Sequence, residues 1–213
     1  MNKLRGFLLA GVVFWLAPIA GAQAGDTQSN SSEKVDFYGG LLADFSASDH
    51  QMFVNGSPIG NSESSSLLGV GGLVGLRGHS GPWFFGAEAD LNANLANAVT
   101  NTGSIDVVHD FGNGHLRVLV GQEIGNVSFF AAGGLAGTRL EFSDTANVLR
   151  GSTGLGWSIG VGADIAVSDS VSLRIEGLHD QYDNIHFDDT NVGAGYNTKW
   201  SENTVRVGAV FKF

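Results

Sequence analysis

From Val35 onward, apolar residues alternate with polar residues or glycine in segments of about ten residues, and turn-forming stretches separate these segments. A period of two places successive side chains on opposite faces, which is typical of β-strands. The pattern predicts eight strands, over residues 35–46, 67–78, 83–95, 115–124, 127–142, 154–167, 171–187 and 200–213.

The segments between the predicted strands alternate in length. Residues 79–82, 125–126 and 168–170 form short connections, whereas 47–66, 96–114, 143–153 and 188–199 are longer and rich in Gly, Asn, Ser and Asp. This alternation is typical of antiparallel up-and-down β-barrels in outer membranes, with tight turns on the periplasmic side and long loops outside. We therefore expect an all-β, eight-stranded antiparallel up-and-down transmembrane β-barrel.

The two faces of the predicted strands differ in chemistry. One face is apolar, whereas the other carries mainly glycine and charges of both signs. Eight strands enclose a space only wide enough for side chains, so glycine prevents overfilling and inward charges must pair. The expected interior polar network comprises Glu88, Asp90, Asp164, Arg174, Glu176, Arg206 and Lys212, with Arg77 and Arg117 as further members. Such an interior predicts little or no conductance.

A soluble lipocalin-like barrel is the alternative, but it would place apolar residues inside and charges outside. Aromatic residues favour the membrane barrel, because they fall near strand ends as interfacial girdles do. The expected periplasmic girdle is Phe37, Tyr38, Trp83, Phe84, Phe85, Phe129, Phe130, Phe211 and Phe213, and the external one is Phe45, Phe142, Trp157, Tyr182, Phe187 and Trp200. The facing of 127–142 stays open, because two phenylalanines are adjacent there.

Residues 1–24 predict a signal peptide, with Lys3 and Arg5 before an apolar run and Ala22-Gln23-Ala24 as the cleavage site. A short membrane anchor is the alternative. Residues 25–34 predict a flexible lead-in, and 35–213 the barrel. The chain contains no cysteine, and its 21 Asp and Glu against 11 Lys and Arg argue against nucleic acid as a partner.

Two stretches resemble a known family. Gly156 to Glu176, GWSIGVGADIAVSDSVSLRIE, is similar to a strand hairpin of the small opacity/OmpA-like porin-family surface antigens, although Gly177 stands where that family usually has Tyr. The alternating Val205, Val207, Ala209, Phe211 and Phe213 resemble the terminal signal that hands such barrels to the barrel-assembly machinery. The resemblance implies an outer-membrane location, contacts with outer-membrane lipids and lipopolysaccharide, and no catalytic residues or cofactors; we expect a monomer.

Candidate chemistry is sparse. His79-Ser80 is better explained as turn chemistry than as a lipid A deacylase pair, and eight strands are too few for the protease barrels. Asp180, Asp183, Asp188 and Asp189 are weak candidates for a divalent metal site, against the alternative of a solvated loop. The sequence thus predicts a structural surface antigen with four exposed loops, and not an enzyme. The alternatives are a loop-mediated adhesin or ligand-binding protein and a lipid A-modifying enzyme.

Overall fold

The computed structural model describes residues 35–54, 57–95, 100–101, 106–143, 149–189 and 194–213. The chain divides into two units, Met1–Ser32 and Glu33–Phe213, and the second unit contains the strands. The predicted signal peptide and lead-in lie outside the described residues and stay predictions.

No helix within the described residues is long and apolar enough to cross a membrane.

The described part of the second unit consists of β-strands. They are β1 (Val35–Val54), β2 (Ser57–Ser80), β3 (Trp83–Asn94), β4 (Thr100–Asn101), β5 (Asp106–Ile124), β6 (Val127–Ser143), β7 (Leu149–Ala166), β8 (Val171–Asp189) and β9 (Ala194–Lys212). Among the described strands, the two-residue β4 pairs with the first residues of β5, Asp106 and Val107. Eight long strands therefore form the wall, as the sequence predicts.

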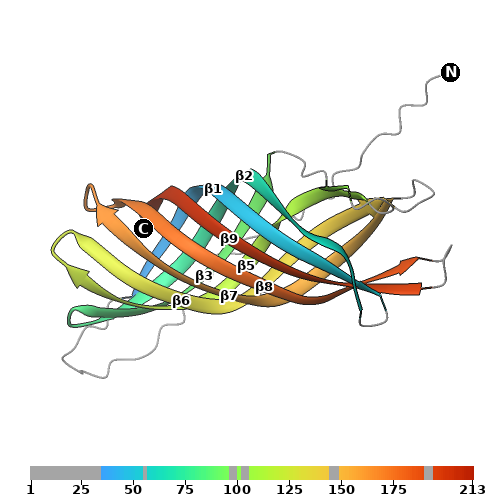
Figure 1. Cartoon of the computed structure of the whole chain (residues 1–213). Helices are drawn as coiled ribbons and strands as arrows, with labels where there is room; N and C mark the ends of the chain where they lie inside the picture. Colours follow the sequence, from blue (N-terminus) through green and yellow to red (C-terminus); the bar gives the residue numbers. More distant parts are fainter. Residues whose placement is uncertain (1–34, 55–56, 96–99, 102–105, 144–148, 190–193) are drawn as a thin grey trace, which may run out of the picture. The chain divides into compact units, whose positions relative to one another are not determined.

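The strands close into a ring. Each long strand pairs antiparallel with the next one along the chain, and β9 pairs with β1 to complete the cylinder (Figure 1). Closure leaves no open sheet edge among these strands, so their backbone groups bond within the wall. The predicted fold class, an all-β eight-stranded antiparallel barrel, is confirmed.

The register of the pairs fixes the size of the barrel. Paired residues lead round the ring from Tyr38 through Gly75, Glu88, Arg117, Gly134, Ser158, Asp180 and Glu202 to Ser48. The path thus returns to β1 ten residues further along, from position 38 to 48. A stagger of this size in eight strands gives a tilt of about 40° and a radius of about 8 Å. Side chains can fill a cylinder this narrow.

The strands extend beyond the predicted boundaries at one end of the barrel. β1 and β2 stay paired as far as Val54 and Ser57, and β8 and β9 as far as Asp189 and Ala194. Much of the predicted loops 47–66 and 188–199 is therefore hairpin. Neighbouring strands already in register continue to pair through polar residues, and polarity alone does not end a strand. At the opposite end the turns are tight, and Gly81 and Gly125 adopt φ values of 59° and 66° that glycine tolerates best.

The outward face is apolar. Exposed side chains on it include Leu41, Leu91, Leu116, Val118, Leu155, Val161, Ile175, Val205 and Val207. The girdle prediction is wrong for five aromatics, because Tyr38, Phe84, Phe130, Tyr182 and Trp200 are buried inside. The side chains of Phe142 and Phe187 lie outside the described ones. On β6, Phe129 faces outward and Phe130 inward, which settles the facing that the sequence left open.

Three of the inward aromatics lie opposite glycine. Tyr38, Phe84 and Phe130 are the cross-strand partners of Gly75, Gly121 and Gly162, respectively. A Cβ at any of these glycines would collide with the facing ring. The narrow interior thus accepts a ring on one strand because the next strand carries no side chain at that level.

We predict that Gly121→Leu lowers the free energy of unfolding by about 1–3 kcal/mol or more, because the new side chain would overlap the ring of Phe84. Urea titration of the protein folded in phospholipid vesicles measures this. Gly78→Leu is the matched control, since a Cβ there meets nothing within 4 Å. Equal stability of the two variants would contradict the packing described.

Candidate functional site

The central interior holds an ion-pair network in which acids and bases alternate. Among the described side chains, it joins four arginines to four carboxylates, all nearly inaccessible. The network consists of Arg77, Arg117, Arg174, Arg206, Glu88, Asp90, Asp164 and Glu176. Its formal charges cancel, which suits a space that water does not fill.

Arg174 on β8 connects two carboxylates. Its Nε donates to Asp164 Oδ1 at 2.7 Å and its Nη2 donates to Oδ2 at 2.9 Å, a two-pronged contact that fixes the guanidinium plane. Its Nη1 donates to Glu88 Oε1 at 2.7 Å. Glu88 belongs to β3, which lies across the ring from β8 with three long strands between them on either side. This hydrogen bond therefore spans the lumen.

Arg117 and Arg206 extend the network along the barrel axis. Both bind Glu176, through Nη1 of Arg117 at 2.6 Å and Nε of Arg206 at 2.8 Å. Arg206 also contacts Asp90 at 3.1 Å, and Arg117 contacts Glu88 at 3.1 Å. Each carboxylate in this group thus has at least two cationic neighbours. Removal of one carboxylate would therefore leave two buried arginines short of a partner.

Aromatic rings line the network on the side of the tight turns. The guanidinium carbon of Arg77 lies 4.6 Å from the ring centres of both Tyr38 and Phe84. That of Arg174 lies 4.8 Å from the ring centre of Phe130. Cations over ring faces are attracted by the ring quadrupole, most strongly away from water. The Tyr38 hydroxyl also donates to Glu88 at 2.8 Å.

On the side of the long hairpins, His115 bridges two aspartates. Its Nδ1 lies 2.7 Å from Asp90 Oδ1 and its Nε2 lies 3.1 Å from Asp180 Oδ2. All three side chains are buried. Asn113 Nδ2 donates to Glu202 at 3.2 Å in the same region. The polar interior therefore continues from the network toward the long hairpins.

Lys212 is the predicted network member that lies apart from the others. Its side chain is 42% exposed at the turn end of the barrel and pairs with Asp36. His79 lies 3.7 Å from the same carboxylate and 3.3 Å from Glu123. These residues form a partly solvated rim at the turn end. Within it, the partners of His79 are the acids Asp36 and Glu123 and not the adjacent Ser80.

Of the four candidate metal-binding aspartates, the structure describes the side chain of Asp180. Asp180 is fully buried and bound to His115, so the expectation that it belongs to an external cluster is wrong. The side chains of Asp183, Asp188 and Asp189 lie outside the described ones. Within the described part of the chain, no group of three or more His, Asp or Glu side chains could hold a metal ion. His179 and Asp180 also point to opposite faces of β8, which separates them chemically.

Sequence reasoning missed Tyr38, His115 and Asp180 as interior groups. The signal for Asp180 is its parity, because it shares the inward face of β8 with Arg174 and Glu176. His115 likewise shares parity with Arg117. Tyr38 carries the same signal, but an aromatic near a strand end also fits an interfacial girdle, and only the facing distinguishes the two.

Comparison with known proteins identifies the family. The profile of the outer membrane protein β-barrel domain matches residues 11–197. The chain belongs to this family of outer-membrane β-barrels. It is 28% identical over 131 residues to the 25 kDa outer-membrane immunogenic protein of Brucella canis, covering 61% of this chain but only 58% of that protein. It is 26% identical over 147 residues to a 22 kDa outer membrane protein of Rhizobium leguminosarum bv. viciae, covering 68% and 67%, respectively.

Among solved structures, the attachment invasion locus protein Ail of Yersinia pestis aligns with 82% of this chain and 99% of its own, at 11% identity and a TM-score of 0.47. As a member of the family, the protein lies in the outer membrane, and lipid surrounds its apolar outward face. Of the alternating residues, Val205, Val207, Ala209 and Phe211 lie on that outer side of β9, and Phe213 follows the strand with an exposed side chain.

We predict that Glu176→Gln lowers the free energy of unfolding by about 3–5 kcal/mol, because Arg117 and Arg206 would both lose a buried carboxylate partner. Urea titration in phospholipid vesicles gives the value. Glu123→Gln, at the exposed rim, should change it by less than about 1 kcal/mol. A loss at position 176 no larger than that at 123 would refute the network as a source of stability.

Proposed function

We propose that this outer-membrane barrel is a structural surface antigen with a closed interior and no catalytic activity. The observation that carries the proposal is the hydrogen bond from Arg174 to Glu88, which joins opposite walls of the barrel. The surrounding arginines and acids bind one another inside the same wall. An interior filled in this way holds the wall together and leaves no path for solutes.

The antigen role is supported by the form of the barrel. The long hairpins β1–β2 and β8–β9 extend the wall at the end opposite the tight turns, which is the outer side in barrels of this kind. The Brucella relative carries the name of an immunogenic protein. We further propose outer-membrane lipids and lipopolysaccharide as partners, the assembly machinery as a partner of β9, and a monomeric state. A loop-mediated adhesin remains the second hypothesis.

Electrical recording tests the closed interior. We expect the purified protein, folded and inserted in planar bilayers, to show no large and stable channels, with an open porin as the positive control. The gel mobility of the unboiled protein verifies folding. Large, long-lived conductance steps from the folded protein would overturn the proposal.

A further inference from the structure

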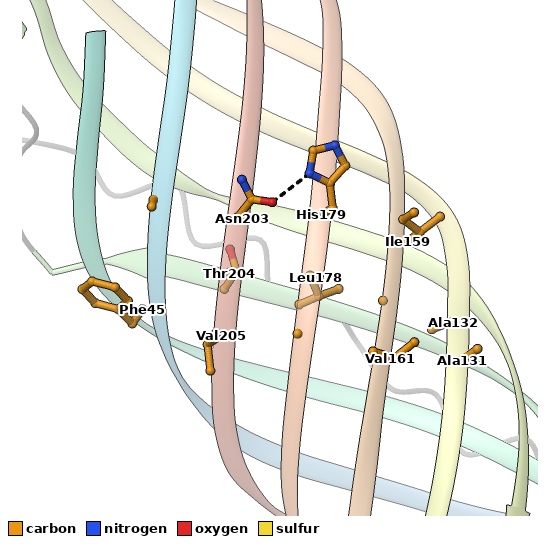
Figure 2. Close-up of a pocket in the computed structure, with 13 residues that line it drawn as sticks. Phe45, Ala131, Ala132, Ile159, Val161, Leu178, His179, Asn203, Thr204 and Val205 are labelled. Atoms are coloured by element: carbon orange, nitrogen blue, oxygen red, sulfur yellow. Dashed lines mark hydrogen bonds between the residues drawn. The ribbon is translucent and has the colours of Figure 1, made fainter.

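The outer wall contains a groove of about 770 Å³ that the sequence pattern does not predict (Figure 2). It lies over β8, with β7 and β6 on one side and β9 and β1 on the other. Gly177 on β8 is part of its lining, and the cross-strand partners of Gly177 are Val161 and Val205, which also line it. A Cβ built on Gly177 would meet nothing within 4 Å, so the gap follows directly from the missing side chain.

The groove is apolar along most of its length. Phe45, Ile159, Val161 and Val205 surround it, and each is more than half exposed toward the surrounding lipid. A hollow in a lipid-facing wall is filled by hydrocarbon, because neither water nor polar groups are stable there. Its volume and apolar lining therefore suit an acyl chain.

One end of the groove is polar. His179 Nδ1 and Asn203 Oδ1 are hydrogen-bonded at 2.9 Å, and Figure 2 shows this pair at the edge of the apolar lining. The Trp157 ring lies 5.6 Å from that of His179. Tryptophan concentrates at membrane–water interfaces, and His179 is nearer than Gly177 to the external end of β8. The polar end thus lies at the level of the outer-leaflet head groups.

The order of these groups matches an amphiphile entering from the outer leaflet. After its mutual bond, the His179–Asn203 pair still offers a second ring nitrogen and amide N–H donors. Lys199 lies four residues further out on the same face of β9 and is exposed, so it can attract phosphate. We propose that the groove binds one acyl chain of a phosphorylated outer-leaflet glycolipid, lipopolysaccharide, with its head group against His179, Asn203 and Lys199.

This inference rests on the proposed lipid contacts but not on the closed interior, so bilayer conductance cannot decide it. The test uses the full barrel in nanodiscs that contain lipopolysaccharide and phospholipid, and native mass spectrometry counts the lipid that stays bound. Wild-type protein should retain one glycolipid. Gly177→Phe should reduce retention by about tenfold or more, because its ring occupies the chain's place.

Gly72→Phe is the matched control. Gly72 also faces outward, its Cβ would meet only a backbone oxygen at 3.6 Å, and it lies outside the groove. This variant should retain glycolipid as the wild type does. The double variant His179→Ala with Asn203→Ala should retain several-fold less glycolipid while phospholipid retention stays constant. The mobility shift on boiling verifies that each variant is folded.

Four results would overturn the inference. The first is equal retention by wild type and Gly177→Phe, and the second is no preference of the wild type for lipopolysaccharide over phospholipid. The third is a wild-type dimer that Gly177→Phe converts to a monomer, which would assign the groove to a second copy of the chain. Loss of glycolipid in both glycine variants alike would also contradict a specific groove.

Discussion

Pairing of opposite charges inside a narrow cylinder is the constraint on which this structure depends. Closure of eight strands satisfies the backbone, but the backbone cylinder is only about 8 Å in radius, and its inward side chains leave too little space to hydrate ions one by one. The arginines and carboxylates of the interior therefore bind one another, and Arg174 reaches from β8 to Glu88 on β3 across the whole width. The stability of the barrel and the closed interior that we propose would then have the same origin.

The two environments of the barrel wall, lipid outside and the narrow interior, explain the distribution of its side chains. Lipid accepts the leucines, valines and isoleucines of the outer face, and the interior accepts three of its aromatic rings opposite glycine, as Phe130 faces Gly162. The same use of glycine has the opposite effect on the outside, where Gly177 faces hydrocarbon and leaves a groove. The position of a glycine relative to the wall thus decides whether it completes packing or opens a site.

Much of this could be predicted from the sequence. Period-two alternation specified the eight strands and their faces, and Arg174, Glu176 and Arg206 followed from parity. The limits were physical. Polar residues such as Ser64 and Ser65 continue a strand when a partner strand is already in register, so loop boundaries were misjudged. Aromatics at strand ends, such as Phe84 and Trp200, fit either face by composition. The contact between His115 and Asp180 joins strands far apart in sequence, which no local pattern encodes.

A double-variant cycle on Arg174 and Asp164 tests the neutrality of the interior most directly. Arg174→Met and Asp164→Leu each leave the buried network with one unmatched charge, and each should lower the free energy of unfolding by about 3 kcal/mol or more. The two together remove opposite charges and should cost less than the sum by about 2–3 kcal/mol. Losses that simply add, measured by urea titration in vesicles, would show that mutual neutralisation does not hold this barrel together.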